Sequence, residues 1–221
     1  MLLSEMICRL RKYIPFVLLI VLLSSCSNDE TSYQTEFCVI EERGDHSLYL
    51  HSDNGYDLSP SSSLDATIYE AGQRFRVTYI EMGSMKLLSD GKLIDVVDML
   101  PVKIFTTLKS ETKSDDPVWF VVDPWISGGF LNFEFSFGYQ NSDKKHGIYL
   151  VRDSIVQGSE GGKVYLSFRH DANKDGTSVV ATAFASSSLS LITESMDIDS
   201  LIFSVQEGRQ KERYSLAINK E

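Results

Sequence analysis

The chain has 221 residues, with 21 basic and 31 acidic side chains and a formal net charge of −10. A strongly acidic surface repels phosphate backbones, so the composition argues against a nucleic-acid partner. The length is enough for one large or two small apolar cores.

The first 25 residues have the three-part layout of a secretory leader. Arg9, Arg11 and Lys12 precede an apolar run over residues 16–23, and two serines follow it. The apolar run is shorter than the roughly 20 residues that cross a bilayer as a helix. We therefore predict that residues 1–25 are a cleaved signal peptide.

Leu23-Ser24-Ser25-Cys26 resembles the lipobox of bacterial lipoproteins, in which the cysteine is acylated and the chain is cut just before it. Several acyl chains such as palmitate would anchor the protein stably, because each buried methylene contributes about 0.8 kcal/mol. We predict lipidation of Cys26 and a membrane-attached place in the cell envelope. The alternative is a plainly secreted protein with an incidental cysteine.

Asp29 and Glu30 resemble the acidic surface-export signals of Bacteroidetes lipoproteins. Attachment to the outer membrane is expected, and a periplasmic or a surface-facing orientation is left open. Loss of the leader brings the net charge near −12 and removes Cys8. With Cys26 lipidated, Cys38 remains alone, so no internal disulfide can form, and we expect Cys38 to be a small buried apolar residue.

Residues 26–35 are polar and are expected to be a lipidated tether. Residues 36–109 read as about five short strands, with a tight turn at Asn54-Gly55. Residues 93–100 combine acidic and apolar side chains and are expected to form one or two helical turns, stopped by Pro101. This order predicts a small barrel of the oligonucleotide/oligosaccharide-binding (OB-like) type.

Residues 110–116 are charged and free of large apolar side chains, so they are the predicted linker to a second domain, residues 117–221. The clearest pattern in the chain lies there, since large apolar residues alternate with polar ones from Leu131 to Tyr139. A period of two over nine residues predicts a strand with one buried face. About seven such strands predict a β-sandwich. The expected fold class is therefore all-β, an OB-like barrel followed by a β-sandwich.

Several segments together look like the NigD-like lipoproteins of Bacteroidetes. These segments are the lipobox leader, Gly72–Tyr79, Leu93–Leu100, Trp125 with Phe130–Phe133, and His146–Val151. The resemblance covers nearly the whole mature chain and implies an amino-terminal barrel and a carboxy-terminal sandwich. The resemblance implies no catalytic residues, and the family has no established biochemical role.

Asp171-Ala172-Asn173-Lys174-Asp175-Gly176 reproduces the first half of a calcium loop, with Asp171, Asn173 and Asp175 as oxygen ligands. The twelfth position, where a bidentate glutamate belongs, is Thr182. Asparagine, aspartate and glycine also favour turns without any metal. A polar hairpin turn is the preferred interpretation, and weak calcium binding is the alternative.

No catalytic set is visible in the sequence, and no metal or other cofactor is expected. The four histidines lack zinc-ligand spacing, and there is no HExxH, paired-cysteine, Gly-x-Ser-x-Gly or phosphate-loop motif. No motif joins Glu134 to Asp197 or Asp199, and solvated charge on an acidic protein explains these carboxylates. An envelope hydrolase would require two carboxylates and a histidine in one pocket.

Trp125 and Tyr139 are the candidate ligand platforms, although aromatic residues in strands more often belong to a core. The leading hypothesis is a non-enzymatic, lipid-anchored binding protein with an unknown protein or glycan partner. The alternatives are a glycan-binding accessory lipoprotein, with Trp125 and Tyr139 exposed in one groove, and a bacteriocin-associated, immunity-like envelope protein.

Overall fold

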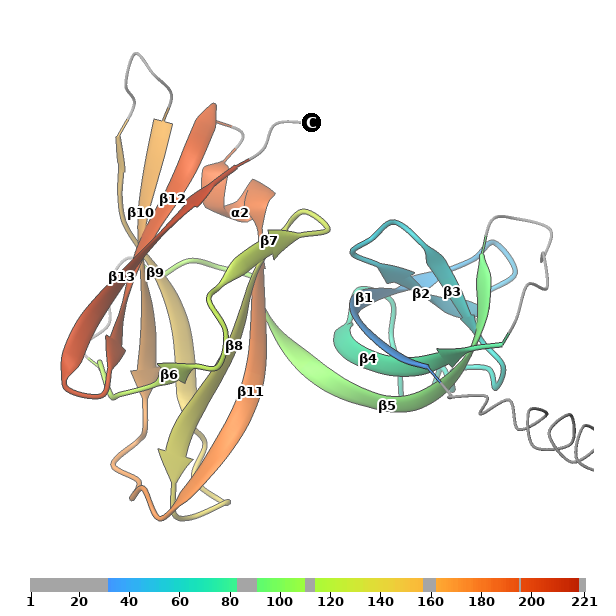
Figure 1. The fold of residues 1–221 in the computed structure, drawn as a ribbon, viewed down its shortest axis with the longest axis horizontal. Coiled ribbons are helices and arrows are strands. Elements are labelled where there is room, and N and C mark those ends of the chain that lie inside the picture. Colours follow the sequence, from blue (N-terminus) through green and yellow to red (C-terminus); the bar gives the residue numbers. More distant parts are fainter. Residues whose placement is uncertain (1–31, 83–90, 110–113, 157–161, 195, 219–221) are drawn as a thin grey trace, which may run out of the picture. The chain divides into compact units, whose positions relative to one another are not determined.

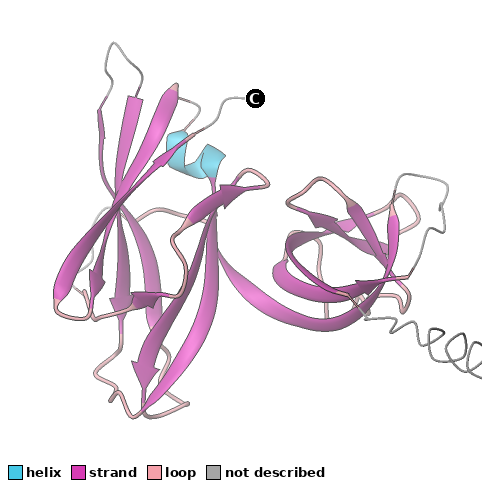
Figure 2. Ribbon diagram, in the orientation of Figure 1, coloured by secondary structure: helices cyan, strands magenta, loops and turns pink. Residues whose placement is uncertain are grey.

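The structure is a computed structural model that describes residues 32–82, 91–109, 114–156, 162–194 and 196–218. The predicted signal peptide, Cys26 and residues 110–113 of the predicted linker lie outside these residues. Residues Tyr33–Glu221 form one compact unit. Within the described part of the chain, no helix combines the length and the apolar character needed to cross a membrane. Figure 2 shows that strands make up nearly all of this unit, with α2 (Leu189–Thr193) as a short helix.

The first five strands close into a small barrel (Figure 1). They are β1 (Tyr33–Glu42), β2 (Leu48–Ser52), β3 (Asp57–Pro60), β4 (Arg74–Glu81) and β5 (Lys92–Phe105). Antiparallel pairs join β3 to β2, β2 to β1, β1 to β4 and β4 to β5, and the parallel β3–β5 pair closes the ring. The predicted barrel is confirmed. Its fully buried core consists of Cys38, Ile40, Leu50, Leu58, Val77, Tyr79 and Ile94.

Cys38 lies in this core with no exposed surface, as the sequence predicts. Burial, more than the neighbouring carboxylates Glu36 and Asp53, raises the pKa of its thiol. A thiol that stays protonated and has no access to solvent is inert, so Cys38 acts as a small apolar residue.

The helix expected at residues 93–100 is wrong, because β5 runs as a strand through the whole segment and through Pro101. Three β-branched residues, Ile94, Val96 and Val97, favour the extended conformation. The β4–β5 register shifts at Thr78/Tyr79, and this irregularity interrupts the simple alternation of apolar and polar residues that identifies strands in a sequence.

The second half of the chain forms two packed sheets. One sheet continues from β5 through β11 (Val179–Ser188) to β8 (Phe130–Tyr139), which also pairs with β6 (Trp119–Phe120) and β7 (Trp125–Ser127). The other sheet has the order β13 (Gln210–Ala217), β12 (Ile198–Glu207), β10 (Gly162–Asp171), β9 (Gly147–Val156). The predicted β-sandwich is confirmed.

The strand predicted at Leu131–Tyr139 provides the centre of the sandwich core. Leu131, Phe133 and Phe135 are at most 1% exposed, and Phe133 packs against Phe168 of the opposite sheet with 4.8 Å between ring centroids. Burying each of these side chains contributes on the order of 2 kcal/mol. Because the other core strands also carry phenylalanines, the two sheets are joined by a cluster of aromatic rings.

Strand β5 belongs to both cores. Ile94 near its start is buried in the barrel, whereas Phe105 at its end is buried in the sandwich. Residues 102–105 pair in parallel with residues 184–187 of β11. Farther on, the backbone of Lys109 bonds to Leu150 and Arg152 of β9.

A buried arginine links the barrel to the sandwich next to this shared strand. The side chain of Arg74 has no exposed surface, and its Nη2 donates to Asp53 Oδ2 at 2.6 Å and to Asn132 Oδ1 at 3.0 Å. Its Nε donates to Ser186 Oγ at 3.1 Å. Arg74 and Asp53 come from the barrel, while Asn132 and Ser186 come from β8 and β11 of the sandwich.

The turn after β7 completes the network on the side of Asp53. Ser127 Oγ donates to Asp53 Oδ2 at 2.5 Å and accepts from Asn132 Nδ2 at 3.0 Å. Gly128 has φ +55°, and a β-carbon on it would lie 2.4 Å from Asp53 Oδ1. Only glycine therefore fits this close approach of the turn to Asp53.

We predict that Arg74→Ala lowers the free energy of unfolding by about 3–5 kcal/mol, because it leaves the Asp53 carboxylate buried without a counter-charge. Arg76→Ala on the same strand is the control. The Arg76 guanidinium lies over the Phe184 ring at 5.3 Å and has no ion pair among the described residues, so its loss should cost less than about 1 kcal/mol. Urea unfolding measures both, and equal costs would contradict the role given to Arg74.

Candidate functional site

Trp125 lines a hollow of about 640 Å³ together with the 126–129 turn, Asp53 and residues near the end of β13. Its ring packs edge-on against Phe37 of the barrel, with 5.3 Å between centroids, and its Nε1 donates to Ser127 Oγ at 3.2 Å. Both the apolar face and the polar group of Trp125 are therefore used in packing the turn against the barrel.

Tyr139 lines a different hollow, of about 380 Å³, at the far end of β8. Phe137 and His146 also border it, with the polar side chains of Asn141 and Lys144 at its rim. Trp125 and Tyr139 are both partly buried, but they do not share a groove. The two predicted platforms are thus not brought together.

A histidine pair that the sequence analysis did not identify lies beside the Tyr139 hollow. His146 Nδ1 lies 2.9 Å from His170 Nε2, and the two rings stack with 5.1 Å between centroids. His146 Nε2 lies 3.3 Å from Asp175 Oδ2, and His170 Nδ1 donates to the Pro117 carbonyl at 3.3 Å. His146 and Asp175 side chains are 7% and 3% exposed, so this cluster is a closed network between two loops.

Proton counting explains the electrostatics of the pair. The Pro117 carbonyl can only accept, so His170 carries its proton on Nδ1, and its Nε2 accepts from His146 when neutral. A second proton on His170, at Nε2, would face the N–H of His146 and lose that hydrogen bond. Burial, and then the neighbouring charge of His146, accordingly lower the pKa of His170. Asp116 and Asp171 oppose that shift without reversing it.

The predicted calcium ligands serve as turn residues. Asp175 accepts from the backbone N–H of Gln140 at 2.9 Å and of Asn141 at 3.1 Å, and these bonds, led by Gln140, lower the pKa of its carboxyl. Asp171 Oδ1 accepts from the backbone N–H of Asn173 at 2.9 Å, which closes a local turn. Across the described chain, no group of three or more histidine, cysteine, aspartate or glutamate side chains could hold a metal ion.

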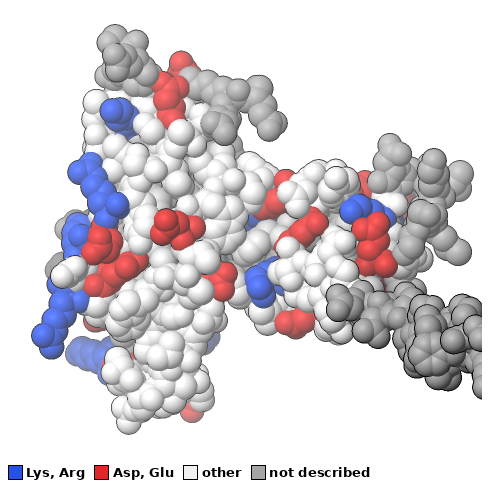
Figure 3. All heavy atoms as spheres, viewed as in Figure 1, with Lys and Arg blue, Asp and Glu red and all other residues white. Residues whose placement is uncertain are grey.

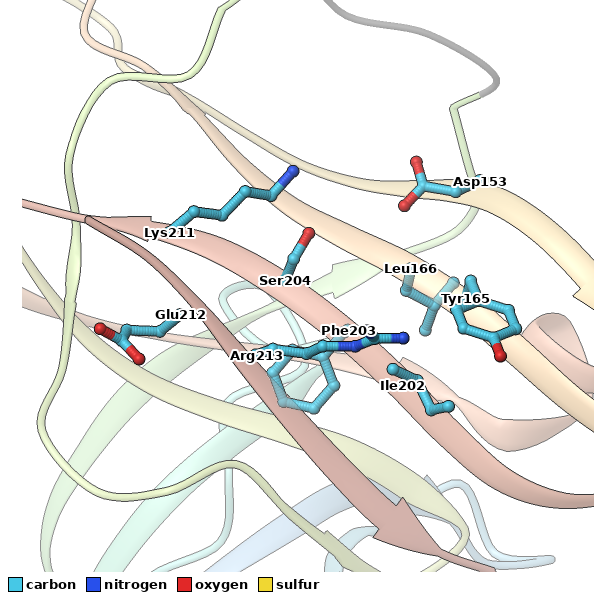
Figure 4. Close-up of a pocket in the computed structure, with 9 residues that line it drawn as sticks. All are labelled: Asp153, Tyr165, Leu166, Ile202, Phe203, Ser204, Lys211, Glu212 and Arg213. Carbon is cyan, nitrogen blue, oxygen red and sulfur yellow. The ribbon is translucent and has the colours of Figure 1, made fainter. Parts of the chain in front are cut away.

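A third hollow, of about 380 Å³, lies on the outer face of the four-stranded sheet (Figure 4). Tyr165 of β10 and Ile202 and Ser204 of β12 form its floor, and Lys211 and Arg213 of β13 extend along it on either side of Ser204. Asp153 of β9 borders the other side and accepts from the buried Ser167 Oγ at 2.7 Å. All of these residues lie on strands, and the β9–β10 register shifts between Tyr165 and Leu166, beside Asp153.

The family profile of the NigD-like C-terminal β-sandwich domain matches residues 101–218, which is more than half of the chain. The chain belongs to the NigD-like family. The matched span starts within β5 and includes every strand of the sandwich.

Solved structures with the same fold come from Bacteroides species. A NigD-like immunity protein from Bacteroides caccae has 19% identity and a TM-score of 0.62, with 84% of this chain and 97% of that chain covered. A protein of unknown function from Bacteroides vulgatus has 19% identity and a TM-score of 0.69, with 86% and 92% covered. A candidate lipoprotein from Bacteroides fragilis has 11% identity and a TM-score of 0.64, with 84% and 98% covered. At these identities the likeness concerns the fold, and among curated proteins no relative is found.

We predict that this NigD-like protein becomes less stable as the pH falls from 7 to 5. An unfolded histidine has a pKa near 6.5, whereas that of folded His170 is lower, so the unfolded chain binds more protons below pH 6.5. The stability contribution is complete above that pH and is lost below it, by at most about 1.4 kcal/mol per pH unit.

Urea unfolding of the wild type and His170→Asn across this pH range measures the effect. The unfolding free energy of the wild type minus that of His170→Asn should be constant above pH 7. This difference should decrease as the pH falls further, because only the wild type loses the contribution of His170. Parallel pH profiles down to pH 5 would contradict the assignment to His170.

We predict that calorimetry with millimolar calcium gives no binding heat, because Asp175 is occupied by the backbone N–H groups of Gln140 and Asn141. Asp171→Ala is the comparison, since it removes one proposed ligand and keeps the others. Saturable heat that disappears in Asp171→Ala would contradict the turn interpretation.

Proposed function

We propose that this NigD-like protein is a lipid-anchored, non-enzymatic binding protein of the cell envelope, attached to the outer membrane. The observation that carries the proposal is the lipobox-type sequence ending at Cys26, placed ahead of a packed all-β unit. The similarity in fold to a candidate lipoprotein from Bacteroides fragilis supports the same placement.

The polar groups near the hollows support a binding role more than a catalytic one. Arg74, Asp53, Asn132 and Ser127 bond to one another and hold the barrel against the sandwich. The carboxylate nearest the histidine pair, Asp175, is taken up by backbone N–H groups. The open hollow on the four-stranded sheet presents charged side chains on a fixed surface, which suits recognition.

Two other roles rest on narrower observations. Protection against a bacteriocin is suggested by the name of the Bacteroides caccae neighbour, which is called an immunity protein. A glycan-binding role would use the Tyr139 hollow alone, because Trp125 lines a separate one. We favour a polypeptide partner, because β13 is, among the described residues, an open edge strand to which an extended chain can pair.

Metabolic labelling with palmitate and cell fractionation test the anchor. The wild type should incorporate label and sediment with membranes, whereas Cys26→Ser should lose the label and remain uncleaved or soluble. Cys8→Ser, which alters a leader cysteine that is not acylated, is the matched control and should behave as the wild type. Label that persists in Cys26→Ser would contradict the proposal, and protease added to intact cells distinguishes the two leaflets.

A further inference from the structure

Strand β13 is an edge strand whose outer side has no partner strand among the described residues. Its inner side pairs with β12 in regular antiparallel register from Gln210 to Ala217, without a bulge. It contains no proline, and the N–H and C=O groups on its free side are therefore available for another strand.

The hydrogen-bond register identifies the residues whose backbone groups face outward. In an antiparallel pair, hydrogen-bonded and non-hydrogen-bonded residue pairs alternate. Ile218 N donates to Asp199 O at 2.8 Å, which makes that pair a hydrogen-bonded one. From this pair, hydrogen-bonded pairs recur at every second residue of β13. The backbone groups of Tyr214 and Glu212 therefore bond to β12, whereas those of Arg213 and Lys211 do not.

A second hydrogen bond, at the far end of β12, indicates the same register. Gln206 lies opposite Lys211, and its carbonyl accepts from Val118 N at 3.0 Å. The Gln206 carbonyl thus points away from β13, as it must in a non-hydrogen-bonded pair. The backbone groups of Lys211, Arg213 and Ser215 therefore point to the free edge.

The same residues carry the positive charge of this face. Tyr214 and Leu216 pack toward the sandwich core, so the alternate side chains of β13 lie on the outer face. Lys211 and Arg213 are exposed and have no ion pair within the described chain, whereas Arg169 on the same face is paired with Asp115. Figure 3 shows Lys and Arg along the edge formed by this sheet, at the left of the view, with Asp and Glu beside them. The two exposed cations of β13 favour acidic side chains on a partner.

We propose that β13 accepts an acidic, extended polypeptide segment of a partner protein as a fifth strand of this sheet. Lys211 and Arg213 are two residues apart, a separation of about 6.7 Å along a strand, which equals the spacing of carboxylates at alternate positions of an extended chain. Main-chain hydrogen bonds would supply affinity, and the paired charges would select the segment. Tyr165 and Ser204 in the adjoining hollow offer further contacts beside the two cations.

A second copy of this chain fits the same edge less well than an acidic segment. Two β13 strands paired antiparallel about a twofold axis at Arg213 would place the two Arg213 side chains opposite one another, and like charges opposite one another destabilise a pair of strands. In the next register Arg213 and Lys211 would face Ser215 and Ala217, which carry no counter-charge. A different protein with acidic side chains supplies that counter-charge.

The inference rests on the proposed binding role and is independent of the lipid anchor. Its probe is a short end-capped peptide in which glutamate alternates with threonine and valine, titrated into the full chain in detergent and followed by fluorescence anisotropy. Saturable binding is expected, and the same composition with contiguous glutamates should bind more weakly. Absence of binding would overturn the inference while leaving palmitate labelling at Cys26 unaffected.

Backbone pairing is tested from the side of the peptide, so that the fold of the protein is not at risk. One peptide carries N-methyl groups on its glutamates and a second carries them on the intervening residues. Because only one edge of an added strand can face β13, one of these peptides should lose binding and the other should keep it. Equal effects of the two methylation patterns would overturn strand addition.

The cations are tested with charge reversals. Lys211→Glu together with Arg213→Glu should weaken binding about tenfold, since each reversal replaces an attraction with a repulsion. Lys163→Glu is the matched control, an exposed lysine on the outer face of β10, away from the free edge, and should change binding by less than about twofold. Thermal unfolding confirms that the variants are folded. Equal weakening by the control, or dimerisation of the wild type through β13, would overturn the proposal.

Discussion

The buried ion pair between Arg74 and Asp53 is the interaction on which the arrangement of this protein depends. A guanidinium without exposed surface needs partners for its charge and its N–H groups, and here Asp53, Asn132 and Ser186 supply them for Nη2 and Nε from both β-domains. Nη1 is buried without a hydrogen-bond partner among the described residues. The aromatic ring of Phe130 lies 4.1 Å from the guanidinium carbon and covers it. The ion pair itself lies within the barrel, and Asn132, Ser186 and Ser127 bond to it from the sandwich. Separating the two would break these hydrogen bonds and leave buried polar groups without partners on both sides. The shared strand β5 ties them covalently as well as through its pairing with β4 and β11.

The four-stranded sheet, for which we propose a role in recognition, is not the one that the barrel contacts. The barrel and the turn after β7 meet the sandwich at β8 and β11, which belong to the other sheet. The outer face of β13, β12, β10 and β9 therefore keeps its hollow and its unpaired cations. A rigid frame lowers the entropic cost of binding an extended segment, since only the segment has to become ordered. The predicted lipid anchor would hold such a frame at a membrane without contributing to the recognition itself.

The strands of large alternating residues could be predicted from the sequence, because burial of one face imposes a period of two, as in Leu131–Tyr139. The first part of β5, residues 93–100, was missed because a register shift and Asp98 beside Val97 obscure that period. Asn132 was expected on a solvated face, yet it is fully buried, because the barrel's Arg74 reaches it from 58 residues away in sequence. His146 and His170 lie at the same end of the antiparallel β9–β10 pair, and two neighbouring strands with a histidine at matching ends are a signal that the sequence analysis did not use. The open edge of β13 requires knowledge of strand order, which local patterns do not contain.

The central claim is that the barrel and the sandwich form one cooperative unit held by the Arg74 network. Differential scanning calorimetry of the intact protein tests it most directly, by comparing the calorimetric enthalpy with the van't Hoff enthalpy of the transition. The account predicts a single transition in which the two enthalpies agree. Two separate transitions, or a calorimetric enthalpy about twice the van't Hoff value, would show that the domains unfold independently and would contradict it.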